Sequence, residues 1–156
     1  PVSGWGHVLN SFEEMEIFHC NLQEARSLSG LTDPKDIAKS IVDKGAGLAL
    51  ISLGRYGAIL ANHEFTISMP AFDVKEVDPT GAGDAFCAGI ISEIMNKEIY
   101  GLKAESYLEI LLKGQAVGAA CITEYGASQG VSIDKVDKLI KSQSKEIIDR
   151  TEIEQR

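Results

Sequence analysis

A glycine-rich segment in the middle of the chain, residues 77–86, has the residue types best suited to chemistry. It reads VDPTGAGDAF and places Gly81 and Gly83 between an expected strand and an expected helix. Glycine permits backbone conformations that are closed to other residues, so successive N–H groups can point into one concavity. The positive end of a helix dipole favours an anion at that position. The segment therefore predicts a phosphate-binding turn.

Asp84 lies in the same turn, where its charge would repel a phosphate unless the carboxylate is needed as a base. A base beside a phosphate predicts phosphoryl transfer, in which Asp84 accepts the proton of a hydroxyl as the phosphoryl group leaves ATP. The alternative is that Asp84 only stabilises the helix dipole and that the glycines are turn residues. The residues alone leave both interpretations open. The chain lacks the Gly-Lys-Ser/Thr segment of a P-loop, and its GAG segment at 45–47 follows a helix, which argues against a dinucleotide-binding fingerprint.

Strands and helices are predicted to alternate around this turn, which indicates the α/β class. Helices are expected at residues 21–30, 33–45, 83–96, 104–123 and 133–145, after which the tail is expected to fray. Strands are expected at residues 17–20, 47–52, 58–61, 65–69 and 73–77, with the third and fourth forming a hairpin. This strand count is low for a doubly wound sheet, so part of the fold is expected to lie upstream of the chain.

The amino-acid composition disfavours several classes of function. The 156 residues include 23 acidic and 15 basic side chains, for a net charge of −8, which disfavours nucleic acid as a partner. The longest apolar stretch, residues 47–53, is too short to span a membrane. Three widely spaced cysteines indicate reduced core thiols and a cytoplasmic setting. The three histidines and the charged run at 141–156 are expected to have structural or solvated roles.

The segment Asp78-Pro79-Thr80-Gly81-Ala82-Gly83-Asp84-Ala85-Phe86 closely resembles the C-terminal signature of the ribokinase-like (PfkB) family of carbohydrate kinases. Three further segments match the family in order, at residues 21–25, 52–57 and 115–127. The resemblance implies the C-terminal half of a three-layer α/β/α fold with a mostly parallel sheet. Residues 1–156 would then be a single α/β unit that carries the nucleotide-binding and catalytic-base functions. The N-terminal half, with the sugar-binding region and the lid, has no counterpart in the chain.

The resemblance also implies a role for each matching residue. The catalytic group is Asp84 with the N–H groups of Gly81, Ala82 and Gly83. The nucleotide-binding group is Asn21, Ser52, Gly54, Gly57 and Gln115, and Glu24 would hold Mg²⁺ through water. A monovalent cation such as K⁺ would be bound by oxygens of Asp78 and Thr80 and by the backbone around Cys121, Glu124 and Gly126. Glu124 departs from the family pattern, since a basic residue is common at that position.

Several of these residues have structural alternatives that the sequence leaves open. Asn21 followed by Glu24 is also the pattern of a helix capping box. Residues 52–57 could be an ordinary tight turn, and Gln115 could be a solvated residue on an otherwise apolar helix.

The function implied by the resemblance is that of a carbohydrate kinase, an ATP- and Mg²⁺-dependent phosphotransferase. The enzyme would transfer the γ-phosphoryl group to a hydroxyl of a sugar or sugar-like acceptor. The alternative is a non-catalytic remnant that binds nucleotide or a protein partner. We expect the chain to be a fragment, and we expect no nucleic acid or membrane partner. Because a half-sheet exposes a strand edge and apolar faces, the missing N-terminal half or a second copy, forming a homodimer, would cover them.

Overall fold

The computed structural model of the protein describes residues 6–95, 99 and 101–156. Contacts within the chain divide it into two compact units. Unit 1 runs to Ser68 and also includes Glu152–Arg156, and unit 2 comprises Met69–Thr151. The single-domain interpretation stays a prediction.

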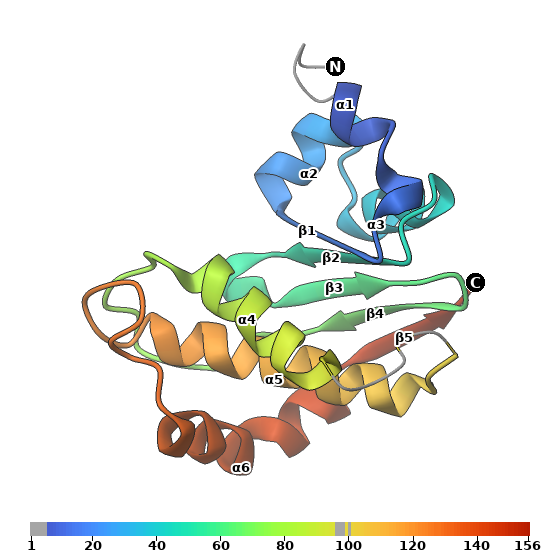
Figure 1. Ribbon diagram of the computed structural model, residues 1–156. Coiled ribbons are helices and arrows are strands. Elements are labelled where there is room, and N and C mark those ends of the chain that lie inside the picture. The colour runs from blue at the N-terminus through green and yellow to red at the C-terminus, as the bar shows by residue number, and fades with distance from the viewer. Residues whose placement is uncertain (1–5, 96–98, 100) are drawn as a thin grey trace. The chain divides into compact units, whose positions relative to one another are not determined.

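Unit 1 is built on a five-stranded sheet with the strand order β1-β2-β3-β4-β5 (Figure 1). The strands are β1 (Ile17–Asn21), β2 (Leu48–Ser52), β3 (Ala58–Ala61), β4 (Phe65–Met69) and β5 (Glu152–Gln155). β1 and β2 are parallel, whereas β2 with β3 and β4 with β5 are antiparallel. The α/β class is confirmed, but the expectation of a mostly parallel sheet is wrong. A turn as short as the one between β3 and β4 can join only antiparallel strands.

Two helices follow the local signals of the sequence closely. α2 (Leu22–Ser29) ends at Gly30, whose φ of 73° is left-handed. α3 (Pro34–Asp43) begins after Asp33, whose carboxylate accepts hydrogen bonds from the N–H groups of the next turn. The apolar side of α3 is fully buried with β2 in the core of unit 1. These helices therefore fix the strands at whose ends candidate site residues lie.

The segment before β1 contains structure that was not predicted from the sequence. α1 (Gly6–Leu9) and a short 3₁₀ helix (Phe12–Glu14) precede the strand. Phe12 is buried, and its ring meets that of Phe18 edge to face with centroids 5.1 Å apart.

The C-terminal tail does not fray, contrary to the expectation from sequence. α6 continues to Asp149, and the chain then forms β5. Lys35 on α3 donates to Glu152 at 2.8 Å and to Glu154 at 2.7 Å, and Lys39 donates to Glu154 at 3.0 Å. Arg156 pairs with Asp43 at 2.5 Å. Backbone pairing with β4 and these ion pairs, rather than an apolar pattern, hold this strand, so hydrophobic periodicity could not reveal it.

The described residues of unit 2 form three helices, α4 (Ala82–Ile94), α5 (Ala104–Cys121) and α6 (Ile133–Asp149). α4 and α5 pack closely at glycines, because a Cβ on Gly89 would lie only 2.8 Å from the Cα of Gly114. Near the start of α4, a Cβ on Gly118 would lie 3.2 Å from the carbonyl oxygen of Ala82. The glycines of α5 thus allow that helix to support the first turn of α4.

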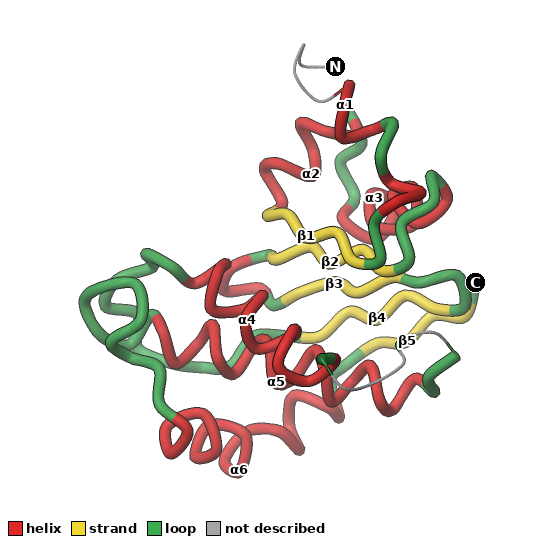
Figure 2. The backbone as a smooth tube through the Cα atoms, viewed as in Figure 1, coloured by secondary structure: helices red, strands yellow, loops and turns green. Residues whose placement is uncertain are grey.

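Residues 73–77 form a loop rather than the predicted strand (Figure 2). The N–H of Asp73 donates to Oε1 of Gln143, and Nε2 of Gln143 donates back to the carbonyl of Asp73. The N–H of Val77 donates to the carbonyl of Ile122 at 2.8 Å. The backbone groups at the two ends of this loop are thus bonded to α6 and to the end of α5 rather than to a neighbouring strand. Among the described helices, none has both the length and the apolar composition to cross a membrane.

Candidate active site

The glycine-rich turn forms the N-terminus of α4 as predicted. Gly81 is the residue that precedes the helix, with φ 80° and ψ 0°. Its carbonyl accepts from the N–H of Ala85 at 2.9 Å, which closes the first turn. The left-handed conformation favours glycine strongly at this position.

The free N–H groups of the turn were expected at Gly81, Ala82 and Gly83, and the structure corrects one of the three. The N–H of Ala82 donates to the carbonyl of Pro79 at 3.2 Å and is therefore engaged. Within the described residues, the N–H groups of Gly81 and Gly83 have no protein acceptor. Two donors without a protein acceptor at a helix N-terminus are suited to bind an anion, with the helix dipole adding to the attraction.

Asp84 is the third residue of α4, and its side chain is exposed. In the described part of the chain, no group forms a hydrogen bond or ion pair with its carboxylate, so the carboxylate can accept a proton from an incoming hydroxyl. The charge of Asp84 also affects the pKa values of two nearby thiols. Burial raises the pKa of Cys87 and of Cys121, and the carboxylate of Asp84 raises both further.

Asp78 links the glycine-rich turn to the loop that follows α5 through hydrogen bonds. Its Oδ1 accepts from the N–H of Thr80, and its Oδ2 accepts from the N–H of Gly126, both at 3.0 Å. The Gly126 N–H, followed by the Thr80 hydroxyl and N–H, holds the pKa of Asp78 below its usual range. Residues 48 positions apart in the sequence are thereby joined through a charged acceptor.

Cys121 and Ala127 complete the packing behind the turn. The buried Cys121 thiol donates to the carbonyls of Ala127 at 3.0 Å and of Thr80 at 3.5 Å. A Cβ on Gly81 would lie 2.6 Å from the carbonyl oxygen of Ala127. The backbone of the loop after α5 is therefore the wall against which the turn rests.

The side chain of Glu124 pairs with a lysine of α6 rather than with the glycine-rich turn. Its carboxylate accepts from the ammonium of Lys135 on α6 at 2.7 Å, and Thr123 Oγ1 accepts from the same ammonium at 2.8 Å. Within unit 2, the predicted residues Asp78, Thr80, Gly81, Cys121 and Gly126 are thus brought together, and Glu124 lies in the same loop with its side chain directed to α6.

The second group of predicted residues lies in unit 1, at the carboxyl ends of β1 and β2. Asn21 and Ser52 are register partners at this edge of the sheet. Asn21 and Glu24 form a capping box, with each side chain accepting from the other's N–H at 2.9 Å. The capping alternative is confirmed, and it leaves the second carboxylate oxygen of Glu24 exposed for another ligand.

The turn after β2 follows the sequence expectation. It contains a 3₁₀ helix (Gly54–Tyr56), and the N–H of Leu53 donates to the carbonyl of Gly57 at 2.8 Å. The φ of 108° at Gly57 is accessible mainly to glycine. Ser52 Oγ lies 3.3 Å from Nε2 of His19 on the neighbouring strand. Both the tight-turn and the nucleotide interpretations remain compatible with this geometry.

Gln115 is buried rather than solvated, so that alternative is wrong. Its Nε2 donates to the carbonyls of Met69 and Pro70, at 3.3 and 3.2 Å. These bonds tie α5 to the start of the loop that leads to the glycine-rich turn. Contact between Gln115 and an adenine stays a prediction, and only the side-chain carbonyl oxygen would be free for it.

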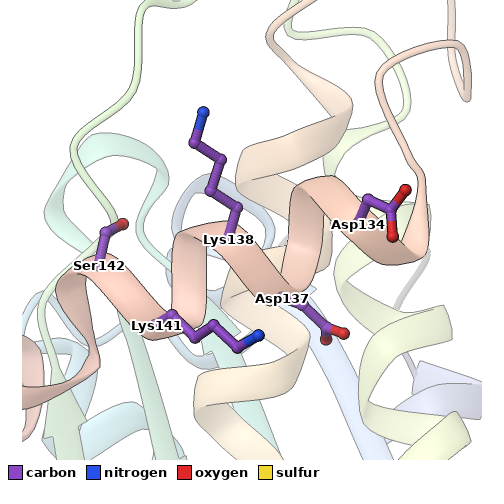
Figure 3. A pocket seen from close by; sticks show the side chains of 5 residues that line it. All are labelled: Asp134, Asp137, Lys138, Lys141 and Ser142. Atoms are coloured by element: carbon purple, nitrogen blue, oxygen red, sulfur yellow. The ribbon is translucent and has the colours of Figure 1, made fainter.

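Three contributors to the site were missed by the sequence analysis: Ile122, Ala127 and Lys135. Ile122 and Ala127 contribute backbone atoms, which leave no signal in residue type. Lys135 lies in an amphipathic helix where lysine is ordinary. A pocket elsewhere in unit 2 includes none of the predicted site residues (Figure 3), and it is lined from α6 alone by Asp134, Asp137, Lys138, Lys141 and Ser142.

Residues 7–134 match the model of the pfkB family carbohydrate kinases. The chain belongs to this family. An ATP-dependent 6-phosphofructokinase from Thermoanaerobacterium thermosaccharolyticum is 32% identical over 124 residues, which cover 80% of this chain and 36% of that protein. The chain spans less than half the length of the first three curated relatives that it matches.

Solved structures confirm the ribokinase-like fold. The aminoimidazole riboside kinase of Salmonella enterica superposes with a TM-score of 0.76 at 29% identity, over 86% of this chain and 45% of that one. A ribokinase from Thermotoga maritima superposes with a TM-score of 0.72 at 23% identity, over 84% of this chain and 44% of that one. The latter likeness concerns the fold alone.

Proposed function

We propose that the protein containing this chain is a carbohydrate kinase that transfers the γ-phosphoryl group of ATP to a hydroxyl of a sugar-like acceptor. The observation that carries the proposal is the turn at the start of α4. There the N–H groups of Gly81 and Gly83 have no acceptor among the described residues, and the exposed carboxylate of Asp84 lies in the same helical turn. The relatives support it, since one is named an ATP-dependent 6-phosphofructokinase and another was solved with aminoimidazole riboside and an ATP analog.

In this proposal each group of the turn has one task. Asp84 accepts the proton of the acceptor hydroxyl as the oxygen attacks phosphorus. The N–H groups of Gly81 and Gly83 donate to oxygens of the transferred phosphoryl group, where negative charge must be stabilised. Preorganised donors of this kind each lower the barrier by about 3–4 kcal/mol in known enzymes. Ala82 is not assigned this task, because its N–H is bonded to Pro79.

The residues of unit 1 can hold Mg²⁺ through water, but they offer few carboxylate ligands. No cluster of three or more His, Cys, Asp or Glu side chains among the described residues could hold a metal ion. The exposed oxygen of Glu24, with Asn21 beside it, suits Mg²⁺ held through water, because Mg²⁺ retains several waters and binds few carboxylates. Bound there with the nucleotide, the ion would neutralise phosphate charge. Asn21, Ser52, Gly54 and Gly57 are proposed to line the nucleotide.

A monovalent cation fits the residues predicted for it poorly. Both carboxylate oxygens of Asp78 accept N–H groups. The Thr80 carbonyl accepts from the Cys121 thiol. No step of the proposal uses such an ion.

The decisive experiment compares Asp84→Asn with Asp134→Asn in the full-length protein. Asp134 is also an exposed first-turn acid, on α6, so it shares the helix-dipole role without the glycine-rich turn. With ATP and a panel of sugars, sugar phosphates and ribosides, Asp84→Asn should lower kcat by about 10²–10⁴-fold, the usual contribution of a general base. ATP binding measured by calorimetry should be retained, and Asp134→Asn should behave like wild type.

Two results would contradict the proposal in different ways. Equal turnover by wild type and Asp84→Asn would exclude Asp84 as the base. Nucleotide binding by the wild type with no phosphoryl transfer to any acceptor would favour the non-catalytic alternative.

A further inference from the structure

A lysine on α6 holds the loop that supports the glycine-rich turn. Nζ of Lys135 donates to Thr123 Oγ1 at 2.8 Å and to Glu124 Oε1 at 2.7 Å. The lysine side chain is only 32% exposed, and its N–H is bonded to the capping oxygen of Ser132 at 3.2 Å. One ammonium thus joins two consecutive residues of the loop to the start of a 17-residue helix.

The same loop contacts the turn at two points. Gly126, two residues after Glu124, donates its N–H to Asp78 at 3.0 Å. Ala127 lies against Gly81, where a Cβ would come within 2.6–2.9 Å of its atoms. Thr123 Oγ1, besides accepting from Lys135, donates to the carbonyl of Ala120 at 2.7 Å in the last turn of α5. The segment from Thr123 to Ala127 is therefore held by Lys135 at one end and meets the turn at the other.

We propose that Lys135 is a positioning residue, which holds Thr123 and Glu124 so that Gly126 and Ala127 keep the Gly81 and Gly83 N–H groups in place for a phosphoryl group. The inference rests on the proposed function, to which it adds a residue that touches neither nucleotide nor acceptor. It also gives the acidic residue at position 124 a role, because a basic residue there would repel Lys135.

We expect the loss of the Lys135 side chain to affect catalysis more than stability. Partly exposed ion pairs contribute little to the free energy of unfolding. A displacement of donors near the reacting atoms is more costly, since about 1 Å of misplacement can lower rates by about 100-fold. Donors that act mainly in the transition state affect kcat rather than KM. We therefore expect Lys135→Met to lower kcat about tenfold, with KM for ATP and acceptor changed less than about twofold.

The experiment uses the full-length protein with four variants. Lys135→Met removes both bonds, Lys135→Arg retains the charge and should recover most of kcat, and Glu124→Gln removes only the charged acceptor. Arg150→Met is the matched control, because it breaks an exposed pair with Glu146 on the same helix that does not reach the loop. Hydrogen exchange of the Gly126 N–H, followed by NMR, measures the position of the loop without any turnover.

Lys135→Met should raise the exchange rate of the Gly126 N–H about tenfold, whereas Arg150→Met should leave it unchanged. Unchanged exchange and unchanged kcat in Lys135→Met would overturn the inference, as would an equal loss of kcat in Arg150→Met. If Lys135→Met does not fold, Glu124→Gln decides by the same two measurements, with a smaller change in the same direction. A wild-type protein without phosphoryl transfer would refute the proposed function, and the exchange of Gly126 would still test whether Lys135 holds the loop.

Discussion

Replacing Gly81 by alanine tests the geometry of the turn most directly, because a side chain there faces two separate penalties. The first is conformational, since φ at Gly81 is 80° and a left-handed backbone costs a non-glycine residue about 1–2 kcal/mol. The second is steric. The new Cβ would lie 2.6 Å from the Ala127 carbonyl oxygen, so that atom must retreat by about 0.8 Å to reach ordinary contact at 3.4 Å.

Gly101 offers a matched control within unit 2. Its φ of 72° is nearly the same, but no atom of the residues that the structure describes lies within 4 Å of the position that a Cβ would take. Gly101→Ala therefore isolates the conformational penalty, which the lower entropy of the unfolded chain offsets by about 0.4–1 kcal/mol. We expect Gly101→Ala to lower the free energy of unfolding by about 1 kcal/mol or less, and Gly81→Ala by about 2–4 kcal/mol.

Urea denaturation followed by circular dichroism measures both values, provided that the m-values agree between variants. Activity gives a second readout, since a shift of this size next to the Gly81 and Gly83 donors should lower kcat by about 10–100-fold in Gly81→Ala. Gly101→Ala should retain wild-type kcat. Equal stability and equal activity of the two variants would refute the claim that Ala127 is the wall of the turn.

Two further predictions concern charged groups outside the reacting centre. Because Gly126 holds the pKa of Asp78 below its usual range, the stabilisation from Asp78 is complete above the ordinary carboxyl pKa and is lost as the pH falls through the lowered value. Asp78→Asn should therefore flatten the acid side of the stability–pH curve in urea denaturation, and an unchanged slope would contradict the assignment. Lys35→Met, which removes the bonds to Glu152 and Glu154, should speed amide exchange in β5 while changing global stability by less than about 1 kcal/mol. Exchange at the wild-type rate would show that β5 is held by other contacts.

The parts of the fold that follow from the sequence are those with local signals. Asn21 and Asp33 cap helices, Gly30 ends one, and the apolar run of β2 marks a buried strand. Each of these depends on residues within about one turn of the position concerned, so the sequence contains the necessary information.

The elements that were predicted wrongly depend on distant partners. Residues 73–77 were predicted to form a strand, but Gln143, 70 positions away, takes the hydrogen bonds of Asp73. β5 has one apolar residue, Ile153, which is 44% exposed, and lysines on α3 pair with its acids. Neither partner leaves a pattern in the segment itself, so local propensity gave the wrong state in both cases.

At Gly81 in the candidate site, a local cause and a distant cause act on the same residue. The need for glycine at position 81 has a local cause, the left-handed start of α4, which the sequence pattern predicts. It also has a distant cause, the backbone of Ala127, whose carbonyl would meet any side chain at that position. Because backbone atoms are common to all residues, the identity of residue 127 says nothing about this contact. In the structure the loop that contains Ala127 is also bonded to Asp78 through the N–H of Gly126, so the loop after α5 shapes the glycine-rich turn as much as the glycines themselves.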